Sequence, residues 1–165
     1  MSGPSVLIRP AAPDDLEVLH RFVVQLAEDE EFPGGVHARP EDLSGALFGA
    51  DPVARALVAQ AEGEPIGFAL YYFAYSTIMG RRTLHLEDLY VVAEHRSRGA
   101  GRLLLHELAR TALAHGCARF EWWVLRTNDP AIGFYRRLGA REVDEIHVMR
   151  LEGAGLAALA GTADG

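Results

Sequence analysis

"TLHLEDLYVVAEHRSRGAGRLLLHELA", residues 83–109, holds the three patterns that decide the fold. Its first part, residues 83–92, is rich in apolar and β-branched residues and predicts a strand. Two glycines and three arginines follow in a tight cluster. Leu104, Leu108 and Ala112 then recur at helical spacing. We therefore predict a strand, a glycine-arginine loop and a helix in direct succession.

The loop carries the pattern RxxGxG on Arg96, Gly99 and Gly101. Glycines let backbone N–H groups come close to a ligand, and the start of a helix adds partial positive charge. The loop therefore suits a diphosphate. It matches neither the P-loop GxxxxGK[ST] nor the dinucleotide pattern GxGxxG. The alternative is a plain glycine turn before a helix, with its arginines in solvent.

Outside this stretch the chain alternates strands and helices, which predicts a mixed α/β sheet. The helix signals are Pro13 with two acidic residues, a cap at Asn128 or Asp129, and a stop at Gly139. "EGEP", residues 62–65, lies between two apolar runs and predicts a β-hairpin. The other expected strands cover 5–11, 54–61, 66–75, 118–125 and 143–151, and the other helices cover 13–32, 39–49 and 128–139.

Length, charge and cysteine content limit the possible functions. A chain of 165 residues fits one domain, and no apolar stretch approaches the roughly 20 residues of a membrane span. The net charge of -7 disfavours nucleic acids and anionic membranes as partners. Cys117 is the only cysteine, so neither an intramolecular disulfide nor a thiolate metal cluster can form. The first ten residues lack the features of a secretory signal, and we expect a cytoplasmic protein.

Three motifs together resemble the GNAT (Gcn5-related N-acetyltransferase) superfamily. They are the RxxGxG loop, "NDPAIGFYRRLGA" at 128–140, and "GFALYYFAYSTIMGRRTLHLEDLYVVAEHRSRGAG" at 67–101. The last is similar to the diamine acetyltransferase branch, with its spermidine/spermine N1-acetyltransferase and thialysine Nε-acetyltransferase types. The resemblance implies an α/β GNAT fold, a mixed, mostly antiparallel central sheet flanked by helices in a single domain. That domain would cover 5–151, with a Gly/Ala-rich tail at 152–165.

The resemblance also implies roles for individual positions, with acetyl-CoA as the co-substrate. Two departures bear on these roles. Ser97 stands where this branch usually has Gly, and Ser76 stands where polyamine enzymes have an acidic residue, as in the thialysine type. The implied acetyl-CoA positions are Leu89, Tyr90, Val91, Arg96, Ser97, Arg98, Gly99, Ala100, Gly101, Arg102, Asn128, Asp129, Pro130, Ala131 and Tyr135. The implied acceptor positions are Asp29, Glu30, Glu87, Glu121, Trp122 and Trp123.

Two of these residues have the chemistry that amine acetylation needs. Glu87 and Asp88 are neighbours in a strand, so we expect their side chains on opposite faces and only one of them in the cleft. The resemblance favours Glu87, which can accept a proton from the amine directly or through water. Tyr135 has a phenol that is still protonated when it meets a thiolate, as a general acid must be. The alternatives are a structural carboxylate at Glu87 and a packing aromatic at Tyr135.

"EDEEF", residues 28–32, is either an acidic rim that holds the far ammonium of a diamine or a solvated helix end. His85 and Glu87 share the HxE spacing of zinc deaminases, but one cysteine cannot complete that site, and we assign no metal.

The resulting hypothesis is an enzyme that transfers acetyl from acetyl-CoA to a primary amine of a small molecule, a thialysine-like amino acid, diamine or polyamine, by direct attack. A protein N-terminal or lysine acetyltransferase and a non-catalytic acyl-CoA sensor are the alternatives. We also expect a homodimer, from the resemblance and from the apolar stretches "FALYYFAY" and "FEWWVL".

Overall fold

The computed structural model describes residues 5–162 of the chain. The chain divides into two compact units, Met1–Arg126 and Thr127–Gly165. The first unit holds β1 (Val6–Pro10), a 3-10 turn η1 (Pro13–Asp15), α1 (Leu16–Asp29), α2 (Pro40–Phe48), β2 (Arg55–Ala61), β3 (Glu64–Ser76), β4 (Arg81–Val91), η2 (Ala93–His95), α3 (Ala100–Ala114) and β5 (Arg119–Trp122). The second unit holds α4 (Asp129–Arg137) and α5 (Gly153–Leu159).

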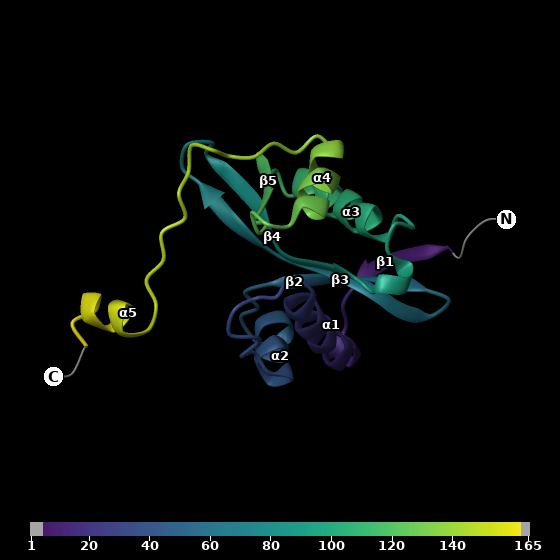
Figure 1. The fold of residues 1–165 in the computed structure, drawn as a ribbon, viewed down its shortest axis with the longest axis horizontal. Helices are drawn as coiled ribbons and strands as arrows, with labels where there is room; N and C mark the ends of the chain where they lie inside the picture. The colour runs from purple at the N-terminus through teal and green to yellow at the C-terminus, as the bar shows by residue number, and fades with distance from the viewer. Residues whose placement is uncertain (1–4, 163–165) are drawn as a thin grey trace. The chain divides into compact units, whose positions relative to one another are not determined.

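A five-stranded sheet in the order β1-β2-β3-β4-β5 forms the centre of the first unit. Neighbouring strands run antiparallel except β4 and β5, which are parallel. Helices α1 and α2 cover one face of the sheet, and α3 covers the other (Figure 1). This confirms the predicted mixed, mostly antiparallel sheet flanked by helices.

The β2–β3 hairpin turns where the sequence predicts it, at "EGEP". Glu62 and Gly63 both have positive φ, at 52° and 88°. That is the backbone of a two-residue turn whose twist matches that of the flanking strands. The turn pairs Ala61 with Glu64 and Gln60 with Pro65, and the register then shifts by one residue, so that Ala59 pairs with Gly67.

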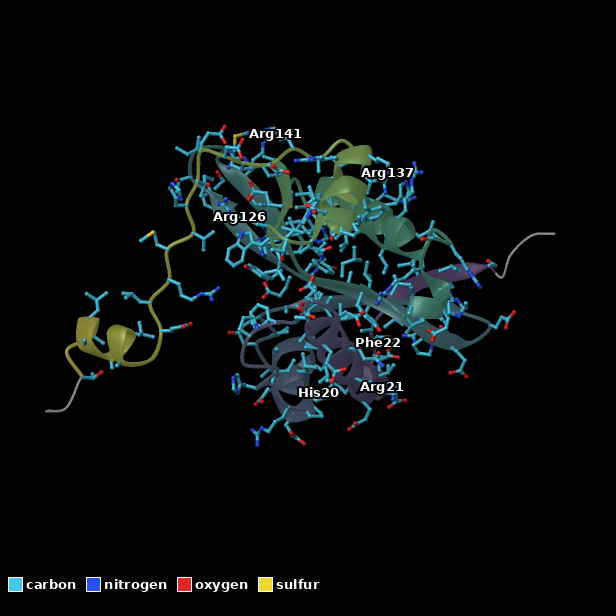
Figure 2. All side chains as sticks on the ribbon, viewed as in Figure 1. His20, Arg21, Phe22, Arg126, Arg137 and Arg141 are labelled. Carbon is cyan, nitrogen blue, oxygen red and sulfur yellow. The ribbon has the colours of Figure 1, made fainter. Side chains whose placement is uncertain are left out.

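Buried contacts between α1 and the sheet fix the position of the C-terminal end of this helix. Phe22 points from α1 towards the sheet (Figure 2) and its ring lies 6.0 Å from that of Phe68 and 5.4 Å from that of Tyr90. Leu19 and Phe22 are almost fully buried, with Phe68 of β3 and Tyr90 of β4 in the same cluster. Because α1 is held in this way, its acidic C-terminal end lies near the end of β4.

The β3–β4 ladder contains an irregularity that matters for the site. Leu70 pairs with Asp88, but the next residue, Tyr71, pairs with Leu86. Glu87 is therefore an extra residue on β4 without a partner on β3, which is a β-bulge. The parallel β5 ladder stops at the same place, because its last pair joins Leu86 to Trp122.

Two strand predictions need correction. The strand expected over 118–125 is confined to β5, because the β4 ladder that it pairs with gives way to the bulge after Leu86. The strand expected over 143–151 is wrong, since these residues form neither helix nor strand. Their alternating apolar pattern finds no partner strand among residues 5–162, and Ile146 and Met149 are 62% and 89% exposed.

The second unit matches the sequence prediction at its first helix. The Asn128 side-chain oxygen accepts a hydrogen bond from the Ala131 N–H at 3.2 Å, and Pro130 lies in the first turn of α4. Of the two predicted caps, Asn128 is the one used. The tail predicted over 152–165 contains α5, and its residues 163–165 lie outside the described part of the chain.

Candidate active site

The glycine-arginine loop joins β4 to α3, as predicted. Its backbone reverses through two left-handed residues, Ser97 at φ 60° and Gly99 at φ 91°. Ala100 begins α3, and none of the described side chains caps this helix start. A Cβ built on Gly99 would meet no atom within 4 Å, so the space in front of the first turn is open. Exposed backbone N–H groups at an open helix start suit an anion.

The side chain of Arg96 links the loop to β4 and to α1. Its Nε donates to the Val91 carbonyl oxygen at 2.8 Å, and its Nη2 forms an ion pair with Asp29 at the end of α1. The guanidinium also lies 5.4 Å from the centre of the Tyr90 ring. Arg98 and Arg102 are exposed, and within residues 5–162 neither forms an ion pair. Arg96 therefore ties the loop to α1, while Arg98 and Arg102 supply the charge for an anionic ligand.

The acidic side chains at the C-terminal end of α1, residues 28–31, have different neighbours. Asp29 is paired with Arg96, and Glu30 lies close enough to Asp88 to raise the pKa of that carboxyl. Glu28 and Glu31 line a hollow of about 220 Å³ beside Phe32. The four carboxylates thus have different neighbours, and the acidic rim stays a prediction.

Both carboxylates of the β4 bulge lie on the face of the sheet that α1 covers. Asp88 pairs with Leu70 and lies two residues before Tyr90, and both of these belong to the core cluster on that face. Glu87 follows His85 at strand spacing, and His85 pairs with Tyr72, two residues after Leu70. The expectation that Glu87 and Asp88 point to opposite faces is therefore wrong, because the extra residue cancels the alternation between them.

The two carboxyls differ in exposure. Glu87 is half exposed, and its Oε2 lies 3.6 Å from Nε2 of the buried His85. Asp88 is partly buried. Burial, together with the charges of Glu87 and Glu30, raises the pKa of Asp88 to about 6.

An aromatic row lies beside Glu87. The ring of His85 lies 4.8 Å from that of Tyr72 and 5.2 Å from that of Trp123, which is 63% exposed. A half-exposed carboxylate and an exposed indole that contact the same histidine suit an alkylammonium ligand, through charge and cation–π attraction. His85 precedes Glu87 by two residues on the same strand, but neither it nor Tyr72 was expected as an acceptor residue, and only the strand pairing brings Tyr72 to this place.

The three acceptor positions on and after β5 do not share one face. Glu121 pairs with His85, whereas Trp122 pairs with Leu86 and packs on Phe120, so Trp122 lies on the α3 face. Glu121 also lies 3.9 Å from Arg119, which balances part of its charge. Trp123 is the one of the three whose ring contacts His85. Trp123 and Glu87 thus both contact His85, whereas Trp122 lies on the other face of the sheet.

Tyr135 lies within the second unit. It follows the Asn128 cap by two turns of α4, and its ring lies 5.4 Å from that of Phe134. The side chain is partly exposed. Arg136, next to it, forms an ion pair with Glu142 after the helix. These contacts leave the general-acid role of Tyr135 a prediction.

Metal-binding clusters and membrane-spanning helices are not found among residues 5–162. Over residues 5–162, no group of three or more His, Cys, Asp or Glu side chains is arranged to hold a metal ion. None of the helices described is both long enough and apolar enough to cross a membrane.

Comparison with known proteins gives consistent matches over most of the chain. The acetyltransferase (GNAT) family model matches residues 20–140. Thialysine N-epsilon-acetyltransferase of Sus scrofa is 40% identical over 168 residues, which cover 95% of this chain and 98% of that protein. The Caenorhabditis elegans protein of the same name is 35% identical and covers 86% of this chain and 83% of its own. An integron cassette protein from the mobile metagenome of V. cholerae has a similar structure, with a TM-score of 0.78, 28% identity, and coverage of 96% of this chain and 99% of its own.

Proposed function

The chain belongs to the acetyltransferase (GNAT) family, and on that premise we propose that it transfers an acetyl group from acetyl-CoA to a primary amine of a small molecule. The observation that supports this acceptor most is that the half-exposed Glu87 carboxylate, on the strand that leads into the loop, and the exposed Trp123 indole both contact His85. The names of the two thialysine acetyltransferases support the same substrate class.

The loop residues 96–102 fit the diphosphate of acetyl-CoA. The open space at Gly99 admits a phosphate close to the backbone, Ser97 to Arg102 supply N–H groups, and Arg98 and Arg102 supply charge. When bound, acetyl-CoA supplies an activated acetyl thioester. In the same proposal the backbone of Leu89 to Val91 holds the pantetheine arm, and Asn128 to Ala131 with Tyr135 also bind acetyl-CoA.

At the acceptor end, Glu87 attracts the ammonium group and takes up a proton from it, directly or through water. The exposed indole of Trp123, whose ring is in edge contact with His85, offers an aromatic surface for the carbon chain. Glu30 adds negative charge from the end of α1. Tyr135 gives its phenolic proton to the departing thiolate.

The acceptor is tested with a panel of amines at fixed acetyl-CoA. Ser76 stands at the end of β3, where its hydroxyl accepts a hydrogen bond from the Met79 N–H at 3.2 Å. A neutral residue there offers no attraction to the second ammonium of a long polyamine. We expect thialysine and short diamines to have a higher kcat/KM than spermine.

Ser76→Asp tests this choice directly. A carboxylate can accept the same hydrogen bond from Met79, so the turn should persist while one charge is added. A charge in an exposed position is worth up to about 1 kcal/mol, which is about 5-fold in kcat/KM for spermine relative to thialysine. Spermine as the best wild-type substrate would contradict the proposal. Peptide substrates acetylated in preference to every amine would favour the protein acetyltransferase, and acetyl-CoA binding without turnover would favour the sensor.

We also propose that the protein is a homodimer. Several apolar side chains lie exposed within the described residues, among them Ile78 at 87% and Leu113 at 78%. Apolar surface of this kind marks an interaction site when it is contiguous. Light scattering at micromolar protein should give twice the 18.0 kDa chain mass. A fully active species of single-chain mass would rule the dimer out.

A further inference from the structure

The β4 bulge places two carboxyls, not one, on the acceptor face of the sheet. In a regular strand Asp88 would point to the α3 side, with Leu86. The pairing of Leu70 with Asp88 and of Tyr71 with Leu86 turns it to the α1 side instead, beside Glu87. Bulges are common next to active sites, where they redirect a side chain. Acetylation of an amine gives this second carboxyl a specific task.

The reaction requires the acceptor nitrogen to lose two protons. An alkylammonium must lose the first to become a nucleophile, because its pKa is near that of lysine, about 10.4. The same nitrogen loses the second proton when it becomes an amide. A single carboxylate can hold one proton at a time, so a second acceptor at the same place removes the need to release the first proton between the two steps.

We propose that Asp88 is the second proton acceptor of the acceptor site, a role that rests on the proposed amine acetylation. Glu87 takes the first proton from the ammonium nitrogen. The nitrogen then forms its bond to the acetyl carbon as the carbon–sulfur bond breaks, and Asp88 takes the second proton. The thiolate takes a proton from Tyr135, which regains one from solvent, while Glu87 and Asp88 each release one to solvent. The net change is one proton released for each amide formed.

The surroundings of Asp88 fit a group that takes up and releases a proton near neutral pH. Glu87 lies on its own strand, Glu30 lies at the end of α1, and both charges disfavour its ionised form. Burial acts in the same direction, and the pKa of Asp88 rises to about 6. The other charged or titratable groups on this face include His85 and Tyr72 around Glu87, Glu121 opposite His85, and Tyr90 with the Arg96–Asp29 pair.

The first test measures thermal unfolding from pH 4 to pH 8 without substrate, for wild type and for Asp88→Asn. The folded-state pKa lies above the usual 3.8, so the ionised carboxyl destabilises the fold above about pH 6, and this penalty disappears as the pH falls towards 4. We expect Asp88→Asn to unfold at a higher temperature than wild type at pH 8, with the difference shrinking below pH 6. Glu64→Gln, an exposed carboxylate at the start of β3, is the matched control and should show no such trend.

The second test divides wild-type kcat/KM by that of Asp88→Asn between pH 5 and pH 8, with the best amine of the panel. The ratio cancels the ionisation of the amine itself. We expect at least about 10-fold at pH 8, falling below pH 6 as Asp88 becomes protonated in the wild type. A ratio near one, or one independent of pH, would overturn the role of Asp88 while leaving amine acetylation intact. If the wild type acetylates no amine, the proposed function fails, and the catalytic role of Asp88 fails with it.

Discussion

A Tyr135→Phe enzyme is expected to lose about 100-fold in kcat while its stability hardly changes. The phenol, with a reference pKa of about 10, is protonated when a thiolate whose acid has a pKa of about 8.5 departs, so it can supply the proton that the leaving sulfur needs. Loss of a positioned general acid costs about 100-fold or more. The variant retains the ring, and with it the contact to Phe134 at 5.4 Å.

Steady-state kinetics with saturating acetyl-CoA and amine measure this loss. The matched control is Tyr75→Phe, which removes one hydroxyl from a tyrosine of β3 that is 67% exposed. It should retain the wild-type kcat. If Tyr135→Phe also retains it, Tyr135 is a packing residue, and the proton of the leaving thiolate comes from elsewhere.

Local signals in the sequence were sufficient to predict most helices and five of the six expected strands. "EGEP" predicts the β2–β3 turn because glycine favours the positive φ that a two-residue turn requires. Asn128 and Pro130 predict the start of α4 because one caps its first turn and the other lacks the N–H that would be left unpaired there. These features depend on neighbouring residues alone.

Features that depend on pairing between distant segments could not be predicted in this way. The bulge at Glu87 follows from the register of β3 against β4, and alternation along β4 alone gave the wrong face for Asp88. The ion pair of Arg96 with Asp29 joins residues 67 positions apart, and no local pattern in the sequence indicates it. The apolar alternation over 143–151 predicted a strand, but a strand also needs a partner edge.

The residues of the candidate site show the same difference between local signals and long-range pairing. The loop and its glycines could be identified from the sequence, because RxxGxG between a strand and a helix carries its own chemistry. His85 and Tyr72 could not, because a histidine inside a strand is usually a core residue. His85 lies beside Glu87 through strand spacing alone, whereas Tyr72 and Trp123 reach this place only through the pairing of Tyr72 with His85 and the ring contact of Trp123 with His85.

Gly99→Val is expected to weaken CoA binding by at least about 10-fold. Gly99 has a φ of 91°, which a β-branched residue adopts only with strain, and its missing Cβ leaves open space in front of the α3 start. A valine would fill that space and turn the loop N–H groups away from the diphosphate. Each hydrogen bond to a charged group that is lost costs about 1.5–3 kcal/mol, which corresponds to 10-fold or more in affinity.

Gly63→Val separates this effect from strain alone. Gly63 has nearly the same backbone, φ 88°, and a Cβ there would also meet nothing within 4 Å, but it lies in the β2–β3 turn. The two variants should therefore lose similar amounts of thermal stability, while only Gly99→Val loses affinity for CoA in titration calorimetry. Equal affinities in two folded variants would mean that the diphosphate does not approach Gly99. RxxGxG would then be a turn that starts α3, and the anion would have to bind elsewhere on the chain.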